Sequence, residues 1–203
     1  ADKTDIKRYV EEGWWEASKG LAEFVRENAQ RNPSGIAYRT SESQISWNEY
    51  FHAAMGLAEQ IKRKTKKGGR ILVWLPDCPD IHICYLACEM AGVVTVGVGW
   101  KAGLQELKYL SEVTGASILL SKRNNPLGKL DDISEYLNLN SLSLEDIFSN
   151  HIVDGERPNL EGSIGPSDLW FLNSTSGTTG LPKCVMQTQN RWFYFHKKAV
   201  EFG

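Results

Sequence analysis

The sequence predicts an α/β fold in which βαβ units surround a largely parallel sheet. Three short apolar runs, residues 70–75, 93–98 and 117–120, have the length and composition of strands buried on both faces. Segments of about a dozen residues with helical apolar spacing separate these runs. Strands that alternate with helices in this way are joined by right-handed crossovers, which make neighbouring strands parallel.

Two helices are expected before the first of these strands. A helix that includes Leu21 closes at the polar residues 28–33. The next helix begins at a capping box, in which Ser46 caps the third helical N–H and Glu49 reaches back to the backbone. Apolar residues then follow at helical spacing, at Tyr50, Ala54, Leu57 and Ile61.

The boundaries of the βαβ units are marked by charge, glycine and proline. The basic run 62–67 suits the C-terminus of the second helix, although a nucleic-acid patch is the alternative, and Gly68 and Gly69 are expected to end that helix. Pro79 opens the helix between the first two strands. The helix between the second and third strands has apolar positions at Leu104, Leu107, Leu110 and Val113.

The pattern weakens after the third strand. Residues 124–166 contain short amphipathic pieces, with a helical turn expected at 144–148. A strand is predicted at Leu169, another begins at Val185, and residues 190–202 form a helix rich in aromatic residues. We interpret these aromatic residues as core or interface packing rather than as a substrate box: Trp192, Phe193, Tyr194 and Phe195.

Composition excludes several classes of protein. The 203 residues are 41% hydrophobic and 24% charged, which is typical of a globular chain with a substantial core. The net charge of −2 gives no general attraction for nucleic acid or an anionic membrane. No apolar run is long enough for a transmembrane helix, and residues 1–5 do not resemble a signal peptide, so we expect a cytoplasmic protein.

The four cysteines show no C-x-x-C spacing. Cys84 and Cys88 are one helical turn apart and His82 is close by, so a metal site is one interpretation. The surrounding helix is apolar nearly all round, which favours buried cysteines that act as small hydrophobic residues. We therefore expect reduced thiols at these positions and at Cys78 and Cys184, and we predict no metal ligands.

Residues 174–185 form the most informative stretch, S-T-S-G-T-T-G-L-P-K-C-V. Hydroxyl groups and glycine backbone N–H groups can surround phosphate oxygens, and Lys183 adds a positive charge. A flexible Ser/Thr/Gly linker is the alternative. The stretch is not a Walker A loop, because Pro182 and Cys184 occupy the positions of the second glycine and the magnesium-binding hydroxyl when Gly177 is aligned with the first glycine.

This stretch resembles the phosphate loop of the adenylate-forming (AMP-binding) superfamily, which includes acyl-CoA and aryl-CoA synthetases. The family loop reads close to T-S-G-T-T-G-x-P-K-G-V, and Thr175 through Lys183 match it position by position, whereas Cys184 replaces a common glycine. Looser similarities follow in the family's order, at residues 46–50, 68–79, 91–94 and 104–120. Residues 12–15, E-G-W-W, resemble the start of members that activate aryl or alicyclic acids.

The resemblance implies an ATP-dependent acid–CoA ligase that forms an acyl adenylate and then a thioester. Its expected cofactors are ATP and Mg²⁺, with CoA as the thiol co-substrate, and its partners are a carboxylic acid and CoA or a carrier protein; a homodimer is compatible with it. A carrier-protein-loading adenylation enzyme and a non-catalytic nucleotide- or partner-binding module are the alternatives. The implied nucleotide-binding residues are Thr175, Ser176, Gly177, Thr178, Thr179, Gly180 and Lys183.

The resemblance also implies that residues 1–203 are the N-terminal part of the family's large domain. The family's magnesium ligand, ribose-binding aspartate, hinge and C-terminal lysine have no counterpart in this sequence, so no catalytic residue is assigned and these residues alone are expected to be inactive. The family's histidine after the loop is replaced by Gln189, and His196 is out of register. The identity of the acid is not encoded in this stretch of sequence.

Overall fold

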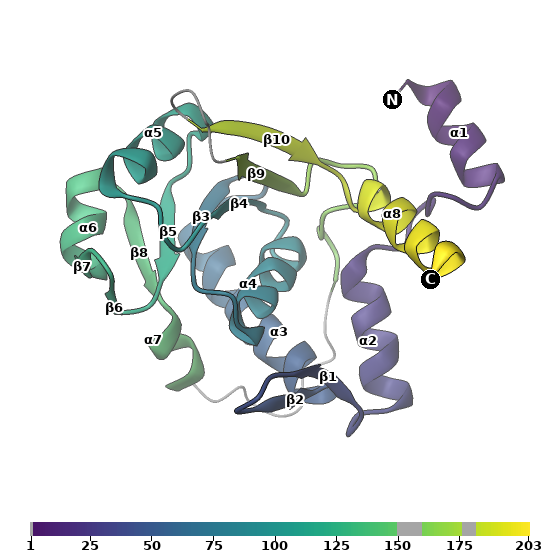
Figure 1. Cartoon of the computed structure of the whole chain (residues 1–203), viewed down its shortest axis with the longest axis horizontal. Coiled ribbons are helices and arrows are strands. Elements are labelled where there is room, and N and C mark those ends of the chain that lie inside the picture. Colours follow the sequence, from purple (N-terminus) through teal and green to yellow (C-terminus); the bar gives the residue numbers. More distant parts are fainter. Residues whose placement is uncertain (1, 150–159, 176–181) are drawn as a thin grey trace.

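The computed structural model describes residues 2–149, 160–175 and 182–203 (Figure 1). The helices are α1 (Lys3–Glu11), α2 (Leu21–Arg31), α3 (Trp47–Lys64), α4 (Pro79–Met90), α5 (Leu104–Thr114), α6 (Leu130–Leu137), α7 (Leu144–Ser149) and α8 (Gln189–Phe202). The strands are β1 (Ile36–Arg39), β2 (Gln44–Ser46), β3 (Arg70–Trp74), β4 (Val94–Val98), β5 (Ile118–Ser121), β6 (Asn124–Asn125), β7 (Gly128–Lys129), β8 (Asn140–Ser143), β9 (Phe171–Thr175) and β10 (Lys183–Gln187).

The central sheet has the strand order β10-β9-β4-β3-β5-β8. Strands β9, β4, β3, β5 and β8 run parallel to their neighbours, whereas β10 is antiparallel to β9. The predicted α/β class with a largely parallel sheet is therefore confirmed. The antiparallel strand β10 forms one edge of the sheet, where it pairs with β9.

Helices cover both faces of the sheet, because alternate residues of each central strand point to opposite sides. Ile71 and Val73 of β3 join the core under α2, α3 and α4, while Leu72 and Trp74 join the core under α5 and α6. In Figure 1, α3 and α4 lie against the sheet in the middle of the view. Helices α5 and α6 lie at one end of the molecule, and α8 lies at the other end. All four residues are fully buried, so the middle of β3 lies in the interior of the domain.

The capping box that begins α3 is confirmed, but the predicted end of the helix is wrong. The N–H of Glu49 donates to Ser46 Oγ (3.2 Å), and the N–H of Ser46 donates to Glu49 Oε2 (2.8 Å). The helix ends at Lys64, four residues before Gly68, and Thr65 is its extended C-cap. Gly68 instead forms a turn with φ of +79°, and its N–H donates to the carbonyl of Gly92 (2.8 Å).

Several short or polar elements escaped the sequence prediction. Helix α1, the β1–β2 hairpin and the strand β8 all lie where no regular structure was predicted, whereas α6 lies in the region where short amphipathic pieces were expected. β8 has the sequence N-S-L-S and forms the other edge of the sheet, so it lacks the apolar character of a strand buried on both faces. α6 is amphipathic and buries Leu130, Ile133 and Leu137, as expected of the short amphipathic pieces foreseen in this region.

The buried cysteines confirm the packing interpretation of α4. Cys84 and Cys88 are completely buried free thiols among apolar neighbours, and burial raises the pKa of Cys88 to about 12. Cys78 and Cys184 are also free and half-buried. In the described part of the chain, no helix combines the length and apolarity needed to cross a membrane.

Candidate functional site

The phosphate loop predicted from the sequence connects β9 to β10. Strand β9 runs parallel to β4, so the loop leaves the sheet at the carboxyl edge of the parallel strands. The register of the hairpin pairs Thr175, the last residue of β9, with Lys183, the first residue of β10. In open α/β sheets, this carboxyl edge is where ligands bind.

Hydrogen bonds fix both ends of the loop. Ser174 Oγ donates to the carbonyl of Gly97 on β4 (3.0 Å), and Thr175 Oγ1 donates to the carbonyl of Lys183 (3.4 Å). The side chain of Phe171 occupies the space beside Gly97 that a Cβ atom would need. The two strands that carry the loop are therefore tied to each other and to β4.

The structure brings together the two predicted site residues that it describes. Thr175 and Lys183 are both exposed, and Lys183 makes no ion pair with any residue in the described ranges. A lysine at the mouth of such a loop can bind an anionic oxygen. The predicted residues that lie outside the described part of the chain are Ser176, Gly177, Thr178, Thr179 and Gly180.

Other groups at the carboxyl edge are packed against each other. The indole Nε1–H of the buried Trp74 donates to the carbonyl of Trp100, which follows β4 (3.2 Å), and the two rings are 5.1 Å apart. Burial raises the pKa of Asp80 at the start of α4, while the nearby Lys122 acts in the opposite direction. The contact between Trp74 and Trp100 thus joins the carboxyl ends of β3 and β4.

Three buried polar residues were not found from the sequence: Glu89 of α4, and Gln189 and Asn190 at the start of α8. We call them the α8 junction. The N-cap of α2 is Gly20, which has no side chain, and other elements cap this helix instead. The N–H of Leu21 donates to Gln189 Oε1 (2.8 Å), and the N–H of Ala22 donates to Glu89 Oε1 (2.9 Å).

Asn190 binds two further segments to the same place. Its Oδ1 accepts from the N–H of Glu16 (2.7 Å), and its Nδ2 donates to the carbonyl of Glu16 (3.0 Å) and to Ser167 Oγ (2.9 Å). Its backbone N–H donates to the carbonyl of Pro166 (2.9 Å). One sequence signal could have identified the junction, namely the single carboxylate, Glu89, in an otherwise apolar stretch of α4.

The aromatic residues of α8 pack as predicted on one side and are exposed on the other. Trp192 contacts Trp170, Phe193 contacts Phe24, and Tyr194 contacts Trp14 in edge-to-face arrangements. Trp192 is nevertheless 49% exposed, and the side chains of Phe195, Val200 and Phe202 are more exposed still. The helix therefore presents a large apolar surface.

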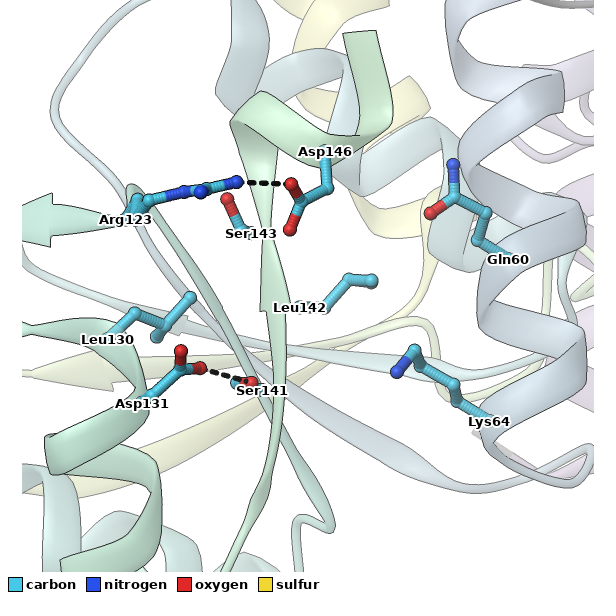
Figure 2. Close-up of a pocket in the computed structure, with 9 residues that line it drawn as sticks. All are labelled: Gln60, Lys64, Arg123, Leu130, Asp131, Ser141, Leu142, Ser143 and Asp146. Atoms are coloured by element: carbon cyan, nitrogen blue, oxygen red, sulfur yellow. Dashed lines mark hydrogen bonds and ion pairs between the residues drawn. The ribbon is translucent and has the colours of Figure 1, made fainter. Parts of the chain in front are cut away.

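A cavity of about 430 Å³ lies beside β8, at the opposite edge of the sheet from β10 (Figure 2). Ser141 Oγ donates to Asp131 Oδ1 (2.8 Å), and Arg123 forms an ion pair with Asp146. Figure 2 shows Lys64 and Gln60 of α3 on the other side of β8 from Asp131. Two lining groups of opposite charge, Arg123 and Asp146, therefore bind each other, and the cavity lies at the edge of the sheet away from the loop.

Comparison with known proteins identifies relatives of the chain. The family described as "AMP-binding enzyme" matches residues 25–201. Enterobactin synthase component E of Escherichia coli (strain K12) is 25% identical over 206 residues, which cover 96% of this chain and 38% of that protein. The D-alanine–D-alanyl carrier protein ligase of Bacillus cytotoxicus is 27% identical over 182 residues, which cover 89% of this chain and 35% of that protein.

Among solved structures, the O-succinylbenzoate coenzyme A synthetase of Bacillus subtilis in complex with AMP has the same fold. The TM-score is 0.76 at 23% identity, and the match covers 92% of this chain and 47% of that one. The chain thus spans between a third and a half of the length of these relatives.

Proposed function

The chain belongs to the family of AMP-binding enzymes, and on this premise we propose that the whole protein activates a carboxylic acid as an acyl adenylate. In this reaction a carboxylate oxygen of the acid attacks the α-phosphorus of ATP, and the bond from that phosphorus to the bridging oxygen of pyrophosphate breaks. A thiol then attacks the acyl carbon, and AMP leaves. Residues 1–203 supply the phosphate-binding part of this enzyme, and the remaining contacts come from further chain.

The pairing of Thr175 with Lys183 at the carboxyl edge carries the proposal. It places a hydroxyl and a positive charge side by side at the two ends of a loop whose intervening residues are three hydroxyl residues, two glycines, Leu181 and Pro182. Donors that are fixed before the substrate arrives stabilise charge on a departing group without reorganisation. We assign Thr175, Ser176, Thr178, Thr179 and the amides of Gly177 and Gly180 as donors to the β- and γ-phosphates, with Lys183 as the charge.

The ammonium group of Lys183 and the hydroxyl group of Thr175 are the described groups that suit a nucleotide phosphate. Lys183 is exposed beside the loop and has no ion pair with a described residue, so its charge is free to meet a phosphate oxygen. Mg²⁺ would neutralise charge on the polyphosphate, and its ligands are expected in further chain. This chain's own contribution is to bind and orient the polyphosphate.

We propose CoA as the thiol acceptor, with the phosphopantetheine of a carrier protein as the second candidate. The relative named as a carrier protein ligase favours the second, and the solved relative named as a coenzyme A synthetase favours the first. The phosphate loop serves either acceptor equally. Incubation of preformed adenylate with CoA or with a holo carrier protein discriminates between them, because only the true acceptor releases AMP.

Acid-dependent exchange of labelled pyrophosphate into ATP tests the adenylation step. The whole protein is assayed with a broad panel of aryl, alicyclic and aliphatic carboxylic acids and with no acid as the control. We expect exchange with at least one acid and none without acid. No exchange with any acid of the panel would refute the proposed activity.

A further inference from the structure

The strand that carries Lys183 is held on one side only within the described part of the sheet. β10 pairs with β9 and forms the edge, so its position depends on that pairing and on what anchors its far end. The far end continues through Thr188 directly into α8, whose first two residues are Gln189 and Asn190. Both side chains are buried, at 1% and 0% exposure.

The α8 junction joins this far end to four other segments. Through Gln189 and Asn190 it contacts the N-terminus of α2, the residues around Glu16 and the segment 166–167. Glu89 adds α4, and its backbone carbonyl accepts from the N–H of Ile164 (3.1 Å). This network therefore restrains the segment that follows β10 through several parts of the chain.

Two polar atoms in this network are buried without a hydrogen-bond partner among the described residues: Glu89 Oε2 and Gln189 Nε2. Both side chains use their Oε1 atom to cap successive N–H groups of α2, and each leaves its second polar atom buried. A Cβ atom on Gly20 would lie 2.8 Å from Glu89 Oε1 and 3.1 Å from Gln189 Oε1, which shows how closely the three residues are packed. An ionised carboxylate is therefore costly at this point of the structure.

We propose that Glu89 and Gln189 are positioning residues for the phosphate loop, which hold β10 and Lys183 in place while Glu89 is protonated and release them when Glu89 ionises. This inference rests on the proposed function of the loop. Its physical basis is the proton on the buried carboxyl group of Glu89. The contact between α4 and the start of α8 is neutral when this proton is bound and charged when it is lost. The effect reaches Lys183 along a strand of five residues with a single described partner strand.

The electrostatics of Glu89 agree with this geometry. Burial raises its pKa to about 7, while the N–H of Ala22, the amide of Gln189 and the N–H of Leu21 act to lower it. Two ionisable groups of neighbouring elements also act on it or feel its charge: Glu23 of α2 and Tyr50 of α3. Glu23 disfavours the ionised form of Glu89, whereas the neutral Tyr50 has its own pKa raised by burial and also by Glu89. With a pKa of about 7, Glu89 loses most of its proton between pH 6 and pH 8.5.

Two measurements on the whole protein test the proposal. The first is the KM for ATP in pyrophosphate exchange between pH 6 and 8.5, and the second is the amide hydrogen-exchange protection of residues 187–191 over the same range. In the wild type we expect KM to rise and protection to fall by about fivefold, the lower end of ordinary coupling between two sites. In Glu89→Gln both should stay at their pH 6 values, because the amide keeps the cap of Ala22 and cannot ionise. Glu112→Gln, an exposed carboxylate of α5, is the matched control and should behave as the wild type.

The possible results distinguish a failure of the proposal about the α8 junction from a failure of the proposed function. Flat KM and flat protection in the wild type, or identical pH profiles in the wild type and Glu89→Gln, overturn the proposal. A change in protection without a change in KM also overturns it, because the junction would then be structural only. If no acid supports exchange, the proposed function fails, while the protection measurement still decides whether ionisation of Glu89 loosens β10 and α8.

Discussion

At the scale of single residues, the site depends on what packs around the loop as much as on the loop itself. Gly97 is an example, because it contributes its carbonyl to Ser174 and leaves room for the ring of Phe171. Neither role is visible in the sequence, where Gly97 is one small residue in a valine-rich strand. The loop motif could be recognised from the sequence because hydroxyl, glycine and lysine residues can bind phosphate directly. Gly97 and Glu89 act through neighbours that are distant in the sequence.

Substitution of Gly97 by alanine should destabilise the protein by about 1–3 kcal/mol, the usual cost of overpacking. The added Cβ would overlap the rigid ring of Phe171, which must then shift together with the start of β9. Gly99→Ala is the matched control, since a Cβ there meets nothing within 4 Å. Urea unfolding measures both variants, and equal stability of the two would contradict this account of the Gly97–Phe171 contact.

At the scale of elements, sequence patterns predicted the buried strands β3, β4 and β5 and the helices α3, α4 and α5, because apolar periodicity and caps are local signals. They missed α1, whose residues are all at least partly exposed, and β8, whose polar sequence is that of an edge strand. The end of α3 was misplaced because Gly68 serves a turn against Gly92 rather than a helix cap. The α8 junction and its contacts with residues 20–22 were missed, because they join parts of the chain that are distant in the sequence, and the carboxylate of Glu89 in the apolar part of α4 was their one local signal.

The junction makes the stability of the protein depend on pH. The pKa of Glu89 is raised from 4.5 to about 7 in the folded state, so the folded state binds more protons than the unfolded state between these values. The free energy of unfolding therefore falls as the pH rises from about 4.5 to 7, by at most roughly 3 kcal/mol from this group.

Glu89→Gln removes this contribution, and its free energy of unfolding should fall less than that of the wild type between pH 5 and pH 8. Urea unfolding at the two pH values, with Glu112→Gln as the control, measures the difference. The free energy of unfolding of the wild type minus that of Glu89→Gln is compared at the two pH values. An equal difference at pH 5 and pH 8 would show that Glu89 is not protonated in the folded state.

At the scale of the whole molecule, the described residues form a sheet with one edge strand beside the loop and an apolar face on α8. Trp192, Phe195 and Phe202 contribute large exposed side chains to this face. Apolar surfaces of this kind mark a place where another part of the protein or a partner packs. The lengths of the relatives, of which this chain spans less than half, agree with our proposal that further chain completes the nucleotide site.

The 203 residues by themselves should therefore bind MgATP weakly. In our proposal the loop binds only the phosphates of ATP, and their attraction must overcome the entropy of association, which is several kcal/mol. Calorimetric titration should show no saturable binding below about 1 mM, equivalent to roughly −4 kcal/mol. Micromolar binding that Lys183→Ala abolishes would show that these residues already form a self-sufficient nucleotide site.

The central claim is that Lys183 and the loop between β9 and β10 bind the phosphates of ATP. The most direct test is kcat/KM for ATP of Lys183→Ala in acid-dependent pyrophosphate exchange by the whole protein, with Lys101→Ala, an exposed lysine after β4, as the matched control. Loss of a charged hydrogen bond costs about 1.5–3 kcal/mol, so kcat/KM for ATP should fall by about 10- to 100-fold in Lys183→Ala and stay near the wild-type value in Lys101→Ala. Wild-type kcat/KM in Lys183→Ala would contradict the claim.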